Sequence, residues 1–355
     1  MVAFYLTLPL VLLAFYRLAV VLHYYVSPPY LKNRPVLRDS LVSVLVPVRN
    51  AGIEDAKQLF TDISVQTYAN IEIIACGDNS NEEIGKVTDD FEKADSRVRF
   101  IEELPNGLLT RNDVLHELTR VAKGDYFLFI DPEVRVSPGF IEKSLAYMQS
   151  KRLTLLSVFP YQPVKSFGDR AVAPVLQWLI LSVYPFKNRA VSSSAMMLKA
   201  NIYRENGWYK QFANDELSDW RIAERIRTSK RRMATLVGTK ADIYLTKKTT
   251  YSNQVTAHST AICEYFGGNS GLMIGYTAIT TLGFWLVLLI LPFPFIFAYL
   301  FSVIVSRALA ADILGHPVYT SVLLLPFQQY ALVQIVNRWM KRNDKRVWRW
   351  KPLRN

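Results

Sequence analysis

Apolar residues are concentrated in long blocks towards the two ends of the chain, and this segregation constrains the fold more than any other feature. The first block, Val2–Val26, is long enough to cross a lipid bilayer. It contains Arg17 and His23, and no small-residue cleavage site follows it. This pattern favours a retained anchor over a removed signal peptide. We therefore predict an N-terminal transmembrane anchor over residues 1–27.

Two further apolar blocks, Tyr276–Val305 and Val318–Val336, predict a C-terminal membrane region over residues 273–337. Pro292 and Pro294 interrupt the first of them, so it could form a hairpin or one kinked span. A hairpin followed by a third crossing would place a basic tail outside the cell, against the positive-inside rule. We therefore expect one long interrupted segment or a re-entrant element.

The formal net charge is +12, and the basic residues of the C-terminal tail, residues 338–355, face Asp344 as their only acid. Tryptophans are interleaved with them, which is typical of a tail at an anionic membrane surface on the cytoplasmic side. Lys32 and Arg34 follow the first apolar block and place the central part of the chain on the same side. We predict an inner-membrane protein with a cytoplasmic domain and no nucleic-acid partner; RNA binding by the tail is the alternative.

Other common chemistries find little support. Cys76 and Cys263 are the only cysteines, which we expect to be reduced and packed. The four histidines are scattered without metal-ligand spacing. A serine hydrolase is not indicated, because the chain has no Gly-x-Ser-x-Gly elbow.

Between these apolar blocks, strand and helix patterns alternate. Buried strands are expected at residues 41–47, 71–76, 98–101 and 126–130, and helices at 56–66, 82–94 and 112–122. Such alternation predicts an α/β domain with a mostly parallel sheet. The apolar stretch Ala171–Phe186 is too short and too interrupted by prolines to span a membrane. It fits an interfacial helix, and a buried core helix is the alternative.

The strand at residues 126–130 runs directly into Asp131-Pro132-Glu133. Ligands collect at the carboxyl ends of strands in open α/β sheets. Two carboxylates at that place suit a hard divalent cation, which most often bridges phosphate oxygens. An acidic turn without ligand is the simpler interpretation of the same residues.

Five short segments follow one another in a recognisable order. They are Val46-Pro47-Val48-Arg49-Asn50, Gly77-Asp78-Asn79-Ser80, the stretch Leu104–Asn112, Asp131-Pro132-Glu133, and Ser218-Asp219 with Ile222–Arg227. Together they resemble the motifs of membrane-anchored family 2 glycosyltransferases. The similarity is strongest to the lipid-acceptor group, which includes carotenoid, hopanoid-associated and ceramide glycosyltransferases. It covers nearly the whole chain and implies a Rossmann-like GT-A fold over residues 40–264.

The resemblance implies a nucleotide-sugar site. Asp78 would contact the base, although an aspartate there also caps turns and helices. The donor would also meet Pro47, Arg49, Arg111 and Asp131. Asp131 and Glu133 would hold Mg²⁺ or Mn²⁺, which neutralises the charge that develops on a departing diphosphate. Arg111 could equally be a solvated surface arginine.

Asp219 is the expected general base for the acceptor hydroxyl. A helix N-terminal position, where the macrodipole favours an acid, is the structural alternative. Asp215 and Glu216 are rival candidates one turn earlier.

The resemblance implies an inverting transfer of a hexose from a UDP-sugar to a hydroxyl of a membrane lipid or of an isoprenoid or carotenoid. Departures from the family pattern occur at Ala51, Glu133 and Ser218, and the Gly-x-Ser-Lys-Asn stretch has no counterpart with its lysine. They support an alternative, a catalytically degenerate GT-A membrane scaffold that binds nucleotide or a partner protein. A processive polysaccharide synthase is a poorer fit, because its Gln-x-x-Arg-Trp signature is missing before the C-terminal spans.

Overall fold

The computed structural model describes residues 2–37, 39–48, 53–76, 82–101, 110–182, 191–246 and 250–342. The chain divides into two compact units, which we describe separately. The first, the sheet unit, is built from residues 30–161 and 191–247. The second, the helical unit, is built from residues 1–29, 162–190 and 248–345. Two described segments inside the predicted 40–264 domain, residues 162–182 and 250–264, thus pack in the helical unit.

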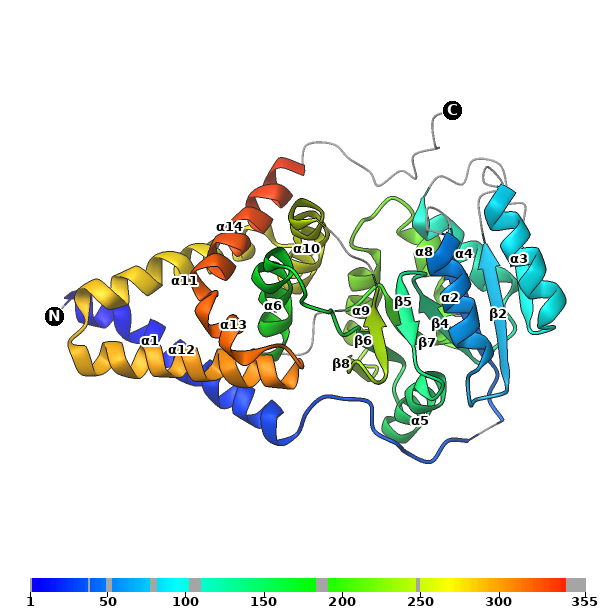
Figure 1. Ribbon diagram of the computed structural model, residues 1–355, viewed down its shortest axis with the longest axis horizontal. Helices are drawn as coiled ribbons and strands as arrows, with labels where there is room; N and C mark the ends of the chain where they lie inside the picture. Colours follow the sequence, from blue (N-terminus) through cyan, green and yellow to red (C-terminus); the bar gives the residue numbers. More distant parts are fainter. Residues whose placement is uncertain are drawn as a thin grey trace. The chain divides into compact units, whose positions relative to one another are not determined.

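The sheet unit alternates strands and helices over its first half (Figure 1). Its elements are β1 (Val42–Pro47), α2 (Ile53–Ser64), β2 (Ile71–Cys76), α3 (Glu82–Ala94), β3 (Val98–Ile101), α4 (Arg111–Val121), β4 (Tyr126–Ile130), β5 (Val134–Val136), α5 (Phe140–Lys151), β6 (Leu155–Phe159), β7 (Ala195–Lys199), α7 (Ala200–Asn206), α8 (Trp208–Gln211), α9 (Ser218–Thr228), β8 (Met233–Val237) and β9 (Ile243–Leu245).

The main sheet has seven strands in the order β3-β2-β1-β4-β7-β6-β8. The first four are parallel neighbours, and β6 is parallel to β8. Only β7 runs the other way, antiparallel to both β4 and β6. The prediction of an α/β fold with a mostly parallel sheet is therefore confirmed. The short strands β5 and β9 form a separate antiparallel pair.

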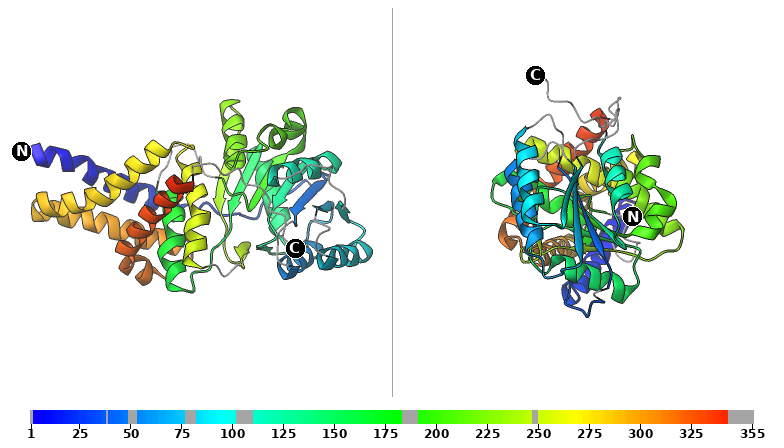
Figure 2. Two further views of the ribbon diagram at one scale, coloured as in Figure 1. Left: turned by 90° about the horizontal axis from the view of Figure 1, so that it is seen from above. Right: turned by 90° about the vertical axis from the view of Figure 1, so that its right-hand side faces the viewer.

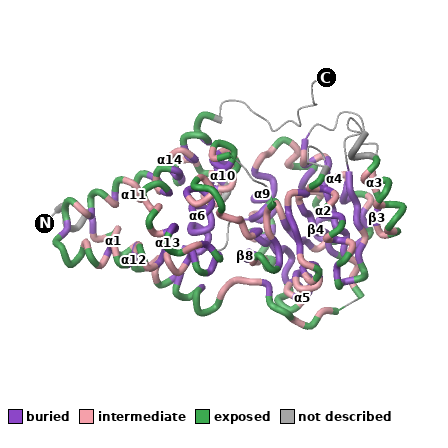
Figure 3. The backbone as a smooth tube through the Cα atoms, viewed as in Figure 1, coloured by how far each residue is buried: buried purple, intermediate pink, exposed green. Residues whose placement is uncertain are grey.

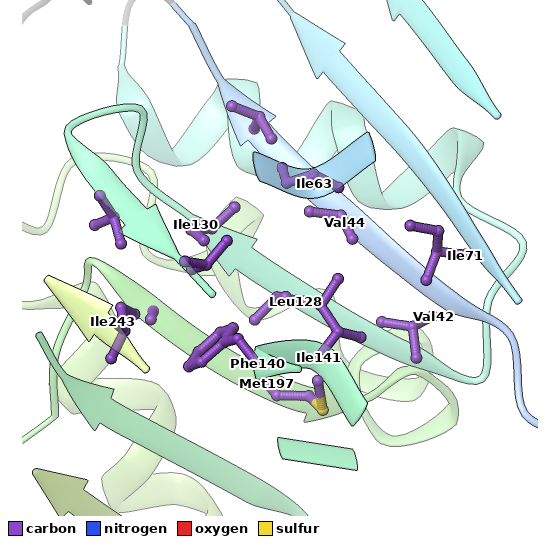
Figure 4. Close-up of a cluster of buried hydrophobic side chains, with 14 of the residues drawn as sticks. Val42, Val44, Ile63, Ile71, Leu128, Ile130, Phe140, Ile141, Met197 and Ile243 are labelled. Carbon is purple, nitrogen blue, oxygen red and sulfur yellow. The ribbon is translucent and has the colours of Figure 1, made fainter. Parts of the chain in front are cut away.

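Helices lie on both faces of this sheet (Figure 2). A hydrophobic cluster covers each face, because successive side chains of a strand point to opposite faces. In β1, Val44 and Val46 join the cluster that α2 and α5 close (Figure 4), whereas Leu45 joins the cluster under α4, α7, α8 and α9. Every residue of β1 and β4 is buried (Figure 3). Strands that are covered on both faces appear in the sequence as continuous apolar runs, and these strands can therefore be predicted from the sequence.

The helical unit contains seven helices among the residues that are described. They are α1 (Val2–Val26), α6 (Phe167–Leu181), α10 (Tyr251–Tyr265), α11 (Ser270–Ile290), α12 (Phe293–Ile313), α13 (Val318–Leu323) and α14 (Leu325–Arg342). Three stretches are long and apolar enough to cross a membrane: residues 7–26 of α1, and the whole of α11 and of α12. Most of each stretch is not buried by protein, which leaves its apolar side chains exposed (Figure 3).

The expectation of one long interrupted segment over Tyr276–Val305 is wrong. α11 ends at Ile290 and α12 begins at Phe293, and each has 21 residues. Pro292 is the N-cap of α12, and the next proline lies in its first turn, where the missing backbone N–H costs nothing. The prolines therefore separate two full-length helices instead of kinking one. The later block, Val318–Val336, is divided between α13 and α14.

α6 forms the core of the helical unit, which contradicts the interfacial interpretation. Residues 171–182 are all buried, and the helix packs against α10, α12 and α14. The buried alternative is therefore correct for these residues; residues 183–186 lie outside the described part. Most of the basic tail, residues 343–355, also lies outside it.

Gly124 permits a close approach between the start of β4 and β1. A Cβ atom at this position would lie 2.4 Å from Ser43 Oγ, 2.7 Å from Ser43 N and 2.9 Å from Leu41 O. Because backbone atoms cannot move aside without disturbing the sheet, we expect Gly124→Ala to lower stability by about 1–3 kcal/mol. Thermal unfolding of the detergent-solubilised chain measures this. Gly275→Ala, whose Cβ has open space around it, is the control and should not lower the melting temperature.

Candidate active site

Asp131 stands at the carboxyl edge of the main sheet, directly after β4. Because β7 is antiparallel to β4, with Ala195 opposite Ile130, the residues that precede β7 lie at the same edge. The backbone N–H of Asp131 donates to the carbonyl of Ser194 over 3.1 Å. Pro47, the last residue of β1, ends the strand that neighbours β4 and is also at this edge. The topology thus fixes the backbone of Asp131 before any side chain contributes.

Arg111 bridges two of the predicted site residues. Its Nη2 donates to Asp131 Oδ1 over 3.1 Å, and its Nη1 donates to Asp219 Oδ2 over 3.3 Å. Nη2 also donates to the carbonyl of Ser193 over 3.2 Å. Arg111 is the first residue of α4, whose N-terminus is fixed by a capping box between Thr110 and Asp113. One cation therefore joins carboxylates that are 88 positions apart, from Asp131 to Asp219, in the sequence.

Asp219 lies in the first turn of α9 and is only 4% exposed. Its Oδ1 accepts a 2.5 Å hydrogen bond from the hydroxyl of Tyr209, a completely buried residue of α8. Its two carboxylate oxygens are thus held by different donors, the phenol on one side and the guanidinium on the other. This arrangement fixes the orientation of the carboxylate.

Asn112 ties the start of α9 to α4. Its Nδ2 donates to the carbonyls of Phe212 and Asp215 over 2.7 and 3.0 Å. Its Oδ1 accepts a hydrogen bond from Ser218 Oγ over 2.9 Å. Ser218, which replaces the glutamate of the family pattern, is therefore part of the contact that positions Asp219.

The charges of the cluster oppose one another. Burial lowers the pKa of Arg111, but Asp131 and Asp219 raise it by more, so that it lies above its ordinary value. Burial raises the pKa of Asp131, against the effect of Arg111, and the charges of Asp219 and Glu133 add to the increase. Burial and the charge of Asp219 keep the pKa of Tyr209 well above its usual range. Arg111 is therefore a permanent cation, and Tyr209 a permanent donor.

Asp131 and Glu133 are the acids at this edge that could hold a cation, with its other ligands supplied by a phosphate. Glu133 is close enough for its charge to raise the pKa of Asp131, and its carbonyl accepts hydrogen bonds from Thr246 N and Oγ1. Among the described residues, no group of three or more His, Cys, Asp or Glu side chains could hold a metal. Mg²⁺ commonly uses one or two carboxylates together with phosphate oxygens and water, so two acids are sufficient.

The structure brings Arg111, Asp131 and Asp219 together, while Arg49 and Asp78 lie outside the described residues. Of the rival acids, Asp215 accepts from Leu217 N and from Arg221 Nε, which is a local structural role. Glu216 is half-buried.

Tyr209 and the backbone of residues 193–194 were not predicted. In the sequence, Tyr209 is indistinguishable from a core tyrosine. Its place depends on the turn at Gly207, which has a φ of 59° and redirects the chain from α7 into α8. The carbonyls of residues 193 and 194 are backbone groups, which every residue type has, so the sequence cannot identify them as part of the site.

Residues 43–205 match the profile of the family described as glycosyl transferase family 2. Among curated proteins, the chain is 33% identical over 111 residues to glycosyltransferase GlyG of Streptococcus pneumoniae, covering 31% of this chain and 36% of that protein. It is 31% identical over 109 residues to glycosyltransferase GlyA of the same species, covering 30% of this chain and 15% of that protein. The chain thus spans about a third or less of the length of these relatives.

A solved structure, the mannosyltransferase PcManGT of Pyrobaculum calidifontis in complex with GDP-Man and Mn²⁺, has a similar fold over 97% of this chain and 98% of that chain. The TM-score is 0.56 at 13% sequence identity. Residues 43–205 are therefore similar to glycosyl transferase family 2 domains, and the chain shares the GT-A fold of this solved structure.

Removal of the Arg111 charge should leave the carboxylates of Asp131 and Asp219 without their shared partner. We expect Arg111→Met to destabilise the chain by about 1–3 kcal/mol near neutral pH, because these groups are largely shielded from water. Arg120→Met, which removes an exposed arginine paired with Glu117 one turn away, should change stability by less than about 0.5 kcal/mol.

The deficit of Arg111→Met should depend on pH. Loss of the cation raises the pKa of Asp131 further. A carboxyl whose pKa is higher in the folded chain than in the unfolded chain lowers the free energy of unfolding as it deprotonates. The difference in melting temperature from the wild type should therefore shrink as the pH falls from 7.5 towards 5. A difference that stays constant over this range would show that the charge is not the cause.

Proposed function

We propose that this chain is a membrane-anchored, inverting glycosyltransferase that uses a nucleotide-sugar donor. The donor would be a UDP-hexose, and the acceptor a hydroxyl of a membrane lipid, an isoprenoid or a carotenoid. The observation that carries the proposal is the bridge from Asp131 through Arg111 to Asp219. The bridge supports the proposal because it joins Asp131, which we assign to the donor phosphates, to Asp219, which we assign as the base, at the carboxyl edge of the sheet.

The donor side is supported by the chemistry of the residues at this edge. Asp131 and Glu133 would hold Mg²⁺ or Mn²⁺, and the ion would supply positive charge to the departing diphosphate. Arg111, whose guanidinium matches phosphate oxygens, would offer a second cation. Pro47, Arg49 and Asp78 complete the proposed donor contacts. The mannosyltransferase PcManGT carries GDP-Man and Mn²⁺ on the same fold, which is compatible with this arrangement.

The acceptor side depends on Asp219. In an inverting transfer, the acceptor oxygen bonds to the anomeric carbon while the bond from that carbon to the diphosphate breaks, and the acceptor proton goes to the base. Asp219 would accept that proton and so lose its negative charge, while the departing diphosphate gains a negative charge. Arg111 contacts both Asp219 and Asp131, so its cation would lie close to the negative charge before and after that charge moves from the base to the diphosphate. Tyr209 would keep the carboxylate oriented throughout.

The three long apolar helices support the membrane part of the proposal. α11 and α12 are joined by Leu291 and Pro292 alone, so two crossings return the chain to the side from which it entered. α14 and the basic tail would then share the cytoplasmic side with the sheet unit. This agrees with the positive-inside rule without requiring a re-entrant segment.

Loss of the base should act on turnover and spare donor binding. We expect Asp219→Asn to reduce sugar transfer by about 10²–10⁴-fold, the usual contribution of general base catalysis. Donor affinity should change by less than about threefold, because the base contributes mainly in the transition state. Asp215→Asn is the matched control, since it changes an acid of the same segment whose bonds go to Leu217 and Arg221. Turnover in Asp219→Asn close to that of Asp215→Asn would remove Asp219 from this role.

Donor and metal should stabilise the chain only together. We expect one nucleotide sugar to raise the melting temperature of the detergent-purified chain in the presence of Mn²⁺, and the increase to vanish with a chelator. It should also vanish in Asp131→Ala and weaken in Glu133→Gln. It should persist in Asp90→Asn, which changes an exposed acid on α3. A folded chain that responds to no donor would favour the catalytically degenerate scaffold.

A further inference from the structure

Two arginines of the helical unit meet at a single tryptophan. Arg307 of α12 places its Cζ 3.7 Å from the centroid of the Trp178 ring, and Arg17 of α1 places its Cζ 4.8 Å from the same ring. Arg17 also lies 5.1 Å from the ring centroid of Tyr276 on α11. We name Arg17, Arg307, Trp178 and Tyr276 the arginine–tryptophan cluster. Its residues come from four helices, α1, α12, α6 and α11.

Arg307 and Trp178 are buried, Arg17 is half-buried, and several of their hydrogen-bond donors have no partner. Arg307 is 6% exposed and Trp178 is 7% exposed. The Nε atoms of both arginines and Nε1 of Trp178 are buried without a hydrogen-bond partner. Arg307 Nη1 donates to Gln328 Oε1 over 3.2 Å, and this acceptor is neutral. The amide nitrogen of Gln328 is already committed to the carbonyls of Arg170 and Ser321.

Within the described part of the chain, neither Arg17 nor Arg307 forms an ion pair with a carboxylate. Aromatic rings attract a cation through their quadrupole, but they do not neutralise it. Two like charges on one ring also repel each other. Buried charges in proteins are almost always paired, and ionisable residues inside membrane helices mark sites of function. Among the described residues, the cluster therefore has no negative charge to balance its two cations.

We propose that the arginine–tryptophan cluster binds the phosphate of an anionic membrane lipid. Guanidinium groups present a planar fork of donors that matches phosphate oxygens, and the indole N–H adds one more donor. A lipid is the expected carrier because α11 and α12 expose large apolar side chains along their length, such as Leu289, Phe297 and Phe301. This proposal does not depend on the glycosyltransferase activity.

The depth of the cluster agrees with a lipid headgroup. Arg307 lies six residues before the end of α12, which is roughly 9 Å along the helix axis. It belongs to the half of α12 that is distant from the turn at Leu291 and Pro292. The cluster therefore belongs to the leaflet on whose side α11 begins and α12 ends. Basic pockets between membrane helices at this level bind phosphate headgroups.

Binding is tested on the full-length chain in a neutral detergent by thermal unfolding against lipids with identical acyl chains. Phosphatidic acid should raise the melting temperature, phosphatidylcholine should raise it less because its choline is cationic, and diacylglycerol should leave it unchanged. Inorganic phosphate separates the two sources of the anion. An equal increase with diacylglycerol would overturn the proposal. An equal increase with inorganic phosphate, together with displacement of the lipid, would overturn the lipid as the source.

Variants connect the response to the cluster. Arg307→Met and Arg17→Met should each weaken the response to phosphatidic acid at least tenfold, about 1.4 kcal/mol. Without lipid, Arg307→Met should melt at or above the wild-type temperature, because it removes an unneutralised buried charge. Arg231→Met, which removes an exposed arginine of the sheet unit, should respond as the wild type does. Full responses in both cluster variants would overturn the site. If Arg307→Met does not fold, Arg17→Met alone decides.

Discussion

The reversed strand β7 is the constraint on which the rest of the candidate site depends. It lies between β4 and β6 and is antiparallel to both, so its first residues come back to the edge where β4 ends. There the carbonyls of Ser194 and Ser193 receive the backbone N–H of Asp131 and a guanidinium N–H of Arg111. The chain then continues through α7 and α8, which carry Tyr209 under the sheet. A parallel strand in this place would present its amino end at the opposite edge.

Charge is then distributed around a single cation. Arg111 pairs with both Asp131 and Asp219. Its guanidinium is suited to this because its N–H donors point in different directions within one plane. A lysine would offer a compact charge without that fork. The same geometry makes the cluster sensitive to an incoming diphosphate, which would compete with both carboxylates for the arginine. Without such a ligand, the guanidinium is paired with the chain's own carboxylates, Asp131 and Asp219.

The sequence predicts those parts of the structure that are governed by local pattern. The central strands are buried on both faces and therefore have continuous apolar runs, such as Val42–Pro47 and Tyr126–Ile130. Arg111, Asp131 and Asp219 could be named because their motifs keep a fixed order. Tyr209 could not, since its role follows from the position of α8 under the sheet. The sequence does not reveal that Pro292 and Pro294 begin a helix, because a proline at a helix start and a proline inside a kinked helix look identical in a linear sequence. Nor does it reveal that α6 is buried in protein, because apolar composition does not distinguish protein from lipid surroundings.

The turn between α11 and α12 would constrain how the proposed membrane helices insert. Only Leu291 and Pro292 separate the two helices, so neither could insert fully without the other. The pair would enter as a single closed hairpin whose leading tip is apolar, and no charged loop would have to be transferred across the hydrocarbon core. Arg307, in the trailing half of α12, would stay near the face of entrance. If the proposed membrane insertion takes place, no charged loop between α11 and α12 would have to cross the bilayer, and the segments outside the hairpin would set its orientation.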